Sequence, residues 1–66
     1  MIGINDRVKI NHECIKYYWD ISGVVKEIDD DHKYDQFLYY IEFDEPELLG
    51  GLKGEYFALE ELDNSE

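Results

Sequence analysis

Hydrophobic and polar residues alternate along parts of this chain with the period of two that is typical of a half-buried β-strand. Residues 6–10 (DRVKI) place two branched apolar side chains on one face and an arginine and a lysine on the other. Residues 36–43 (QFLYYIEF) alternate over a longer stretch and are rich in aromatic and branched residues, which favours a strand. Two shorter apolar runs, residues 23–28 (GVVKEI) and 55–58 (EYFA), predict further strands.

The remaining segments predict loops and short turns, and none sustains a helical period. Residues 11–22 have no clean period, and residues 44–54 contain the only proline, so both are predicted to be loops. The run LEEL at residues 59–62 fits a single 3₁₀ turn, and the polar tail at 63–66 is expected to fray. The pattern therefore predicts an all-β fold in one domain over residues 1–66: a small, closed or partly open barrel of about five short antiparallel strands with a terminal 3₁₀ turn.

The charge of the chain changes what partners are expected. Its 66 residues include 17 acidic and 6 basic side chains, a formal net charge of −11. Such a surface repels nucleic-acid phosphates and anionic membranes and attracts basic proteins or cations, so we expect no direct nucleic-acid binding. No run is long enough for a membrane span, no signal peptide is recognisable, and the only cysteine is Cys14; we therefore expect no membrane insertion and a cytoplasmic location.

The acidic stretch at residues 29–35 (DDDHKYD) invites comparison with a calcium-binding loop. An EF-hand loop needs an oxygen ligand at position 5, glycine at position 6 and glutamate at position 12. Counted from Asp29, those positions hold Lys33, Tyr34 and Tyr40. We therefore interpret the stretch as the solvated tip of a hairpin between the second and third strands.

Other candidate chemistry is equally incomplete. His12 and Cys14 are two residues apart, but the chain offers few further ligands for zinc, and an acidic neighbourhood disfavours the thiolate that a Cys–His nucleophile needs. Acid–base catalysis by paired carboxylates needs a cleft that desolvates one of them, which a barrel of this size can hardly provide. We expect no cofactor, no metal and no enzymatic activity.

Three adjacent aromatic residues, Tyr17, Tyr18 and Trp19, lie in the first predicted loop. Neighbours on an extended chain point to opposite sides, so at least one of them should be partly exposed. The aromatics either anchor a partner or cover an open end of the barrel, and the sequence leaves both alternatives open. Tyr40, on the opposite face of its strand from Ile41, is a second candidate for an exposed aromatic.

The order of these segments resembles that of SH3-like small β-barrels and is closest in pattern to the photosystem I subunit IV family. The resemblance covers residues 3–63 and is carried by the YYW cluster shortly before Gly23 and by the closing FALEEL at residues 57–62. The chain is also similar to ferredoxin–thioredoxin reductase variable chains and to acidic antirepressors that mimic DNA. Subunit IV presents basic residues to acidic ferredoxin, whereas this chain is acidic, so the antirepressors are the better electrostatic match.

These observations predict a non-catalytic, strongly acidic interaction module that binds a basic protein surface. The partner could itself bind nucleic acid, with this chain acting as a DNA-mimic inhibitor, antirepressor or immunity-type protein. The alternative is a peripheral structural or docking subunit of an electron-transfer complex, with a basic patch near Arg7, Lys9 and Lys16. The residues predicted to bind the partner are two aromatic anchors and seven carboxylates: Tyr18, Trp19, Asp29, Asp30, Asp31, Asp35, Asp44, Glu45 and Glu47.

Overall fold

In a computed structural model of the protein, the residues that the structure describes form one antiparallel sheet of five strands, in the order β4-β3-β2-β1-β5. The structure describes residues 2–31 and 36–65, except for the side chain of Asp31. The strands are β1 (Arg7–Ile10), β2 (Ser22–Asp31), β3 (Gln36–Phe43), β4 (Gly54–Ala58) and β5 (Leu62–Asn64). Three 3₁₀ turns connect them: η1 (Lys16–Tyr18), η2 (Pro46–Leu49) and η3 (Leu59–Glu61). The described part of the chain contains no α-helix, so the predicted all-β class is confirmed.

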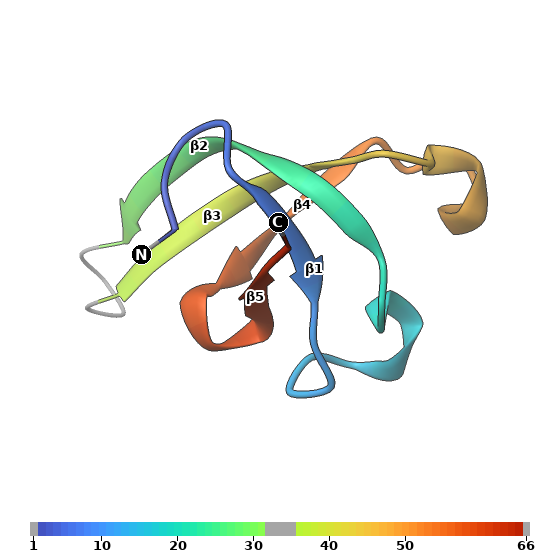
Figure 1. Ribbon diagram of the computed structural model, residues 1–66, viewed down its shortest axis with the longest axis horizontal. Helices are drawn as coiled ribbons and strands as arrows, with labels where there is room; N and C mark the ends of the chain where they lie inside the picture. Colours follow the sequence, from blue (N-terminus) through green and yellow to red (C-terminus); the bar gives the residue numbers. More distant parts are fainter. Residues whose placement is uncertain (1, 32–35, 66) are drawn as a thin grey trace.

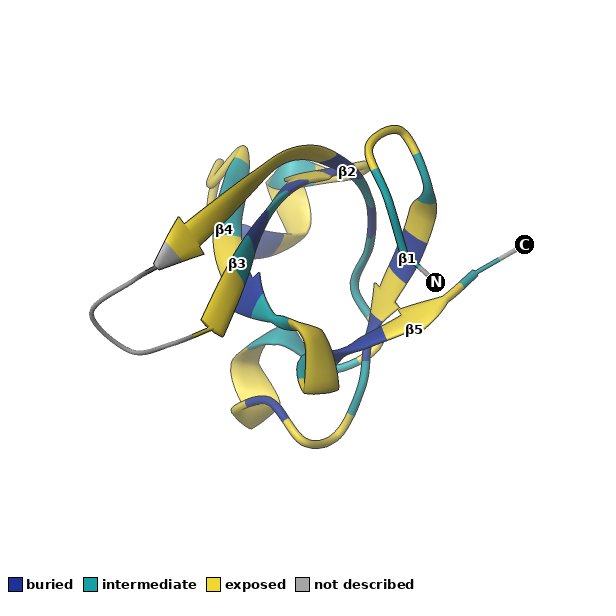
Figure 2. Ribbon diagram, turned by 90° about the vertical axis from the view of Figure 1, so that its left-hand side faces the viewer, coloured by how far each residue is buried: buried dark blue, intermediate teal, exposed yellow. Residues whose placement is uncertain are grey.

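The sheet curls strongly around a single core (Figure 2). β2 and β3 are the longest strands and form its spine, and a bulge between Val25 and Glu27 interrupts their register. A bulge bends its strand and increases the local twist, which helps so small a sheet to close on itself. β4 and β5 form the two edges of the sheet, and the single turn η3 carries the chain from one edge to the other.

The inner face of the curled sheet holds the core, because alternate residues of each strand point inward. Val8, Ile10, Val25 and Ile41 are fully buried. Each such side chain contributes roughly 1.5–3 kcal/mol relative to an exposed one. The aromatic rings of Tyr39, Phe43 and Phe57 fill the space between them. The predicted alternation is therefore confirmed in β1, with its basic side chains on the outside, and in β3 from Leu38 to Phe43. Phe37, at the start of β3, is 54% exposed.

The predicted hairpin tip at residues 29–35 is wrong for its first three residues. β2 runs to Asp31, and Asp29, Asp30 and Asp31 pair with the first three residues of β3. Aspartate has a low intrinsic propensity for strands. Here the backbone hydrogen bonds with β3 outweigh that low propensity. Residues 32–35, including Asp35, lie outside the described residues.

The tail predicted to fray is also ordered over most of its length. Residues 63 and 64 belong to β5, with Lys9 opposite Asp63 and Val8 opposite Asn64. The Ser65 N–H donates a hydrogen bond of 2.9 Å to the carbonyl of Arg7. Buried Leu62 fixes the start of this strand, and pairing then satisfies backbone groups that β1 would otherwise leave open.

Candidate functional site

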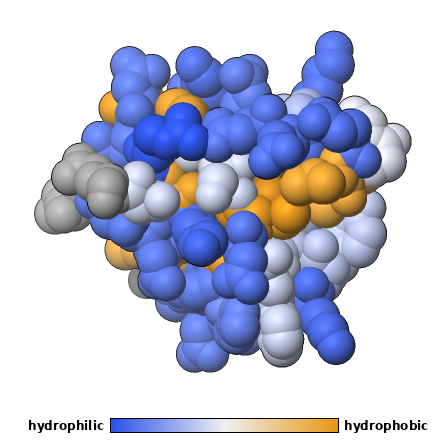
Figure 3. Space-filling view, turned by 45° about the vertical axis from the view of Figure 1, so that its right-hand side comes forward, coloured by the Kyte–Doolittle hydropathy of each residue, from blue (hydrophilic) through white to orange (hydrophobic). Residues whose placement is uncertain are grey.

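Two segments that are far apart in sequence enclose a small hollow beside the start of β2. It is lined by Asp20, Ile21, Ser22, Asp44, Glu45 and Leu48. The first three residues follow the aromatic turn η1, and the last three belong to the loop that contains η2. Both loops lie at the same end of the molecule, and an apolar band bordered by hydrophilic atoms crosses the face that carries them (Figures 1 and 3).

Backbone hydrogen bonds hold the two walls of the hollow together. The N–H of Asp44 donates to the carbonyl of Ser22 over 3.0 Å, which joins the end of β3 to the start of β2. Asp20 has a positive φ of 64° and its N–H donates to the carbonyl of Ile10 over 2.9 Å. Aspartate is one of the few residues besides glycine that tolerate this conformation, so the sharp turn before Ile21 suits the sequence.

Ile21 supplies one side of the apolar wall, and the short turn η2 supplies the other. Its residue Leu49 is buried in the core, whereas the neighbouring Leu48 is 62% exposed beside the hollow. Gly50 ends the turn in the left-handed conformation, with φ of 66°. Burial of Leu49 therefore fixes the orientation of the turn, and Leu48 is left facing solvent as a consequence.

The carboxylates around the hollow differ in whether a basic side chain of the same chain is paired with them. Asp44 forms an ion pair and hydrogen bond with the guanidinium of Arg7. Asp20 is 3.4 Å from Nε2 of His12, a long contact between two exposed side chains. Among the described residues, Glu45 has no ion-pair partner. Asp20 and Glu45 thus provide most of the available negative charge beside the apolar wall.

The aromatic cluster is divided between the core and the surface. Tyr18 packs on Phe43 and Phe57, with ring centroids 6.0 and 5.2 Å away. Tyr17 is 59% exposed, which confirms that one of the three aromatics reaches solvent. Trp19 is half-buried, and its indole N–H donates to the carbonyl of Cys14 over 2.7 Å.

The Trp19 indole is contacted by neighbours from its own loop. The His12 ring stacks on it with a centroid separation of 4.1 Å, and Nζ of Lys16 lies 5.9 Å from the ring centre. Tyr18 therefore packs against the core, Trp19 packs within its own loop, and Tyr17 is the most exposed of the three rings. The predicted role of Tyr18 and Trp19 as partner anchors stays a prediction.

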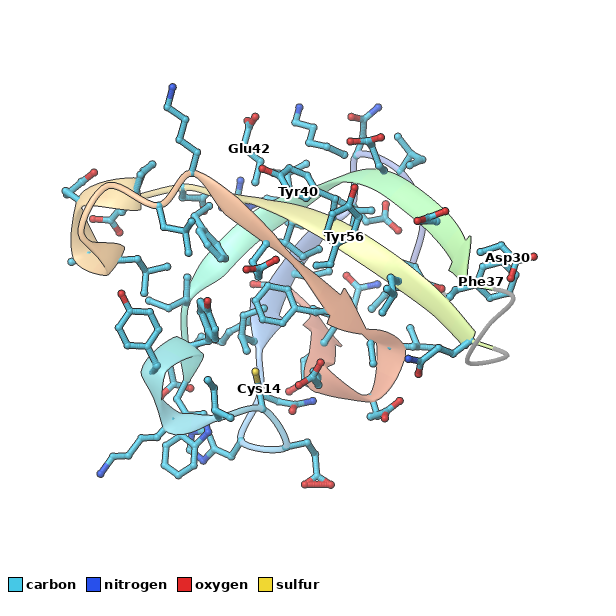
Figure 4. All side chains as sticks on the ribbon, turned by 180° about the vertical axis from the view of Figure 1, so that it is seen from behind. Cys14, Asp30, Phe37, Tyr40, Glu42 and Tyr56 are labelled. Carbon is cyan, nitrogen blue, oxygen red and sulfur yellow. The ribbon has the colours of Figure 1, made fainter. Side chains whose placement is uncertain are left out.

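The predicted acidic residues fall into two separate groups. Asp44 and Glu45 line the hollow, and exposed Glu47 lies beside them in η2. Asp29–Asp31 lie at the far end of β2, at the opposite end of the molecule (Figure 1). Asp29 pairs with Leu38 on the outer face, whereas Asp30 pairs with Phe37 on the inner side, where the two side chains lie close together (Figure 4).

Sequence patterns missed four residues of the hollow: Asp20, Ile21, Ser22 and Leu48. Asp20 directly follows the aromatic cluster, so its place in the motif YYWD was the one available signal. The contributions of Ile21 and Leu48 depend on how η2 packs over the start of β2, which no local pattern encodes.

Cys14 is buried, and its thiol has low nucleophilic reactivity. Burial raises the pKa of its thiol to about 11, and the hydrogen bond with the carboxylate of Glu61 and the negative charge of that group act in the same direction. The thiol is therefore protonated at neutral pH, a state that suits packing rather than nucleophilic attack. The described residues contain no group of three or more side chains placed to hold a metal ion.

Two further findings concern membrane spans and similarity to known proteins. Within residues 2–31 and 36–65, no helix is long and apolar enough to cross a membrane. In comparisons with protein-family models, curated proteins and solved structures, the chain matches none of them.

Proposed function

We propose that this protein is a non-catalytic interaction module that binds a basic protein, with a lysine or arginine side chain of that partner seated in the hollow. The observation that carries the proposal is the combination of an apolar wall, Ile21 and Leu48, with the carboxylates of Asp20 and Glu45. Lysine and arginine have an apolar stem and a charged head, so they match both parts of such a site.

The electrostatics of the whole chain support the same partner class. A net charge of −11 attracts basic surfaces from a distance and speeds their association. Proteins that bind nucleic acid carry such surfaces, and carboxylates displayed on a rigid sheet can occupy them in place of phosphates. A DNA-mimic inhibitor, an antirepressor or an immunity-type protein would act in this way. A cytoplasmic location, expected from the single reduced cysteine, belongs to the same proposal.

A docking role in an electron-transfer complex is the alternative, and it receives less support. It requires a basic patch formed by Arg7, Lys9 and Lys16. Arg7 is already paired with Asp44, and Lys16 lies against the Trp19 ring in another loop. Only Lys9 of the three has neither of these contacts, so a continuous basic surface is not assembled.

Binding of a short lysine-rich peptide, followed by NMR and calorimetry, tests the proposed site. We expect amide shifts at Asp20, Ile21 and Leu48, and a roughly three- to tenfold weaker affinity for the variant Glu45→Gln. Glu13→Gln removes the same charge from an exposed loop and is the matched control, with less than about a twofold effect expected. Equal weakening by both variants, or shifts spread evenly over the surface, would contradict a defined site.

A further inference from the structure

A pair of tyrosines is displayed on the outer face of the sheet, away from the hollow. Tyr40 of β3 and Tyr56 of β4 are direct partners in the ladder, with ring centroids 5.0 Å apart and planes inclined at 63° (Figure 4). Tyr56 is 43% exposed, and Tyr40 is half-buried. The exposed ring of Tyr56 therefore packs edge-to-face against Tyr40, and this contact restrains its orientation.

The absence of a side chain at Gly54 makes room for the Tyr40 ring. A Cβ atom at Gly54 would lie 2.6 Å from Oη and 2.7 Å from Cζ of Tyr40. The Tyr40 ring thus lies directly over the backbone of β4 at Gly54. The side chain of any other residue at position 54 would occupy the same space. An aromatic ring that covers a cross-strand glycine is a rigid arrangement that stabilises the sheet.

Carboxylates border the tyrosine pair on this same face. The register places Glu27 opposite Tyr40 and Asp29 opposite the next outward residue of β3, Leu38. Glu42 is two residues after Tyr40 and so points to the same side, as Figure 4 shows. The negative charge of Glu27 raises the pKa of the Tyr56 phenol, with smaller contributions from desolvation and from Asp29. The negative potential of β2 therefore reaches the exposed ring.

We infer that this outer face, formed by Tyr40, Tyr56 and Glu27, is a second binding site that takes an arginine side chain of the basic partner. A guanidinium is planar, stacks on aromatic faces and pairs with a carboxylate through two parallel hydrogen bonds. The ammonium of lysine is compact and strongly hydrated, so it gains less from the ring. The inference rests on the proposed function, because the same basic partner supplies the arginine.

A second copy of the chain is a poor occupant of this face. Its own Glu27, Asp29 and Glu42 would be brought against the same carboxylates of the first copy. Like charges in such an interface oppose association. Charge complementarity therefore selects a cationic partner.

The test compares two peptides of equal length, hexa-arginine and hexa-lysine, by calorimetry and by NMR of the tyrosine rings. We expect hexa-arginine to bind about fivefold more tightly, with shifts of the Tyr40 and Tyr56 ring signals. Tyr56→Ala should remove this preference, whereas Tyr56→Phe, which keeps the ring, should retain it. Tyr17→Ala removes an exposed tyrosine elsewhere and should leave the preference unchanged.

The outcomes separate this inference from the proposed function. Equal affinities, with shifts confined to Asp20, Ile21 and Leu48, would overturn the arginine site and leave the hollow standing. An arginine preference that survives Tyr56→Ala would also overturn it. Absence of binding by both peptides would overturn both proposals.

Discussion

At the scale of single residues, two glycines mark places where strands approach too closely for a side chain. A Cβ atom at Gly23 would lie 2.5 Å from the carbonyl oxygen of Glu42 and 2.6 Å from Cγ2 of Ile41. Neither neighbour can move easily, because one is backbone and the other is fully buried. Gly23 is therefore required by the β2–β3 pairing itself rather than by a turn.

Replacement of Gly23 by alanine should destabilise the protein. Overpacking at a site with rigid neighbours costs about 1–3 kcal/mol, and urea unfolding measures that loss directly. Gly3→Ala is the matched control, since a Cβ there meets only Asp6 at an ordinary 3.9 Å. If Gly23→Ala unfolds at the same urea concentration as the native chain and Gly3→Ala, the strand packing described above is wrong.

The buried thiol predicts slow chemistry and a defined pH dependence. With its pKa raised from 9.0 to about 11, Cys14 should react with iodoacetamide at pH 7.5 at least about 50-fold more slowly than an exposed thiol. A cysteine placed at the exposed neighbour Ile15, in a Cys14→Ala background, gives the comparison. Similar rates for the two thiols would contradict the burial of Cys14.

The same shift fixes the sign of a stability change at alkaline pH. A thiol whose pKa is higher in the folded state favours folding while it stays protonated. Its contribution is complete below about pH 9 and is lost as the pH rises through about 11. Urea unfolding at pH 8 and 10.5 should therefore show a smaller pH-dependent loss for Cys14→Ala than for the native chain.

At the scale of elements, the strongest strand was predictable and the ends of its neighbours were not. β3 alternates in burial from Leu38 to Phe43, so its inward face follows from the sequence, and its bounds are the predicted ones. Only at the start of the strand does an inward-set residue, Phe37, stay 54% exposed. The acidic end of β2 and the polar β5 have no such pattern, because they exist through pairing with β3 and β1. The hollow combines residues of two loops, and only Asp44 and Glu45 among its lining residues were predicted to bind a partner.

The ordered tail can be checked by hydrogen exchange. The Ser65 N–H is bonded to the Arg7 carbonyl, so its exchange should be slowed at least about tenfold relative to an unstructured peptide of the same sequence. NMR-detected exchange at low temperature resolves this amide. Exchange at the peptide rate would restore the frayed tail that the polar composition predicts.

The acidic residues at the far end of β2 also affect how this strand meets other chains. β1 pairs with β2 only as far as Val24, and Figure 1 shows the β2–β3 ribbon projecting beyond it. In the described part of the chain, no strand pairs with that side of β2 beyond Val25. The carboxylates along this segment discourage edge-to-edge pairing with other chains, a common protection of open strands. Some of the acidity thus has a structural use that is independent of any partner.

At the scale of the whole molecule, charge is the property that joins the two proposed sites. The hollow and the tyrosine pair use different residues, but both combine an apolar or aromatic surface with carboxylates. A basic partner that engaged both would be held at two points on a rigid scaffold, which gives greater affinity than either point alone. The curled sheet fixes the distance between them, so the spacing of basic residues on the partner would also be selected.

Ionic strength offers the most direct test of this account. Binding of hexa-arginine and hexa-lysine should weaken at least about tenfold between 20 and 300 mM sodium chloride, because exposed charges are screened at that salt concentration. Calorimetry at four or five salt concentrations gives the slope of log Kd against log salt. We expect a steep slope for the native chain and a shallower one for Glu45→Gln. An affinity that stays constant across the series would contradict the central claim that this protein recognises a basic surface through its carboxylates.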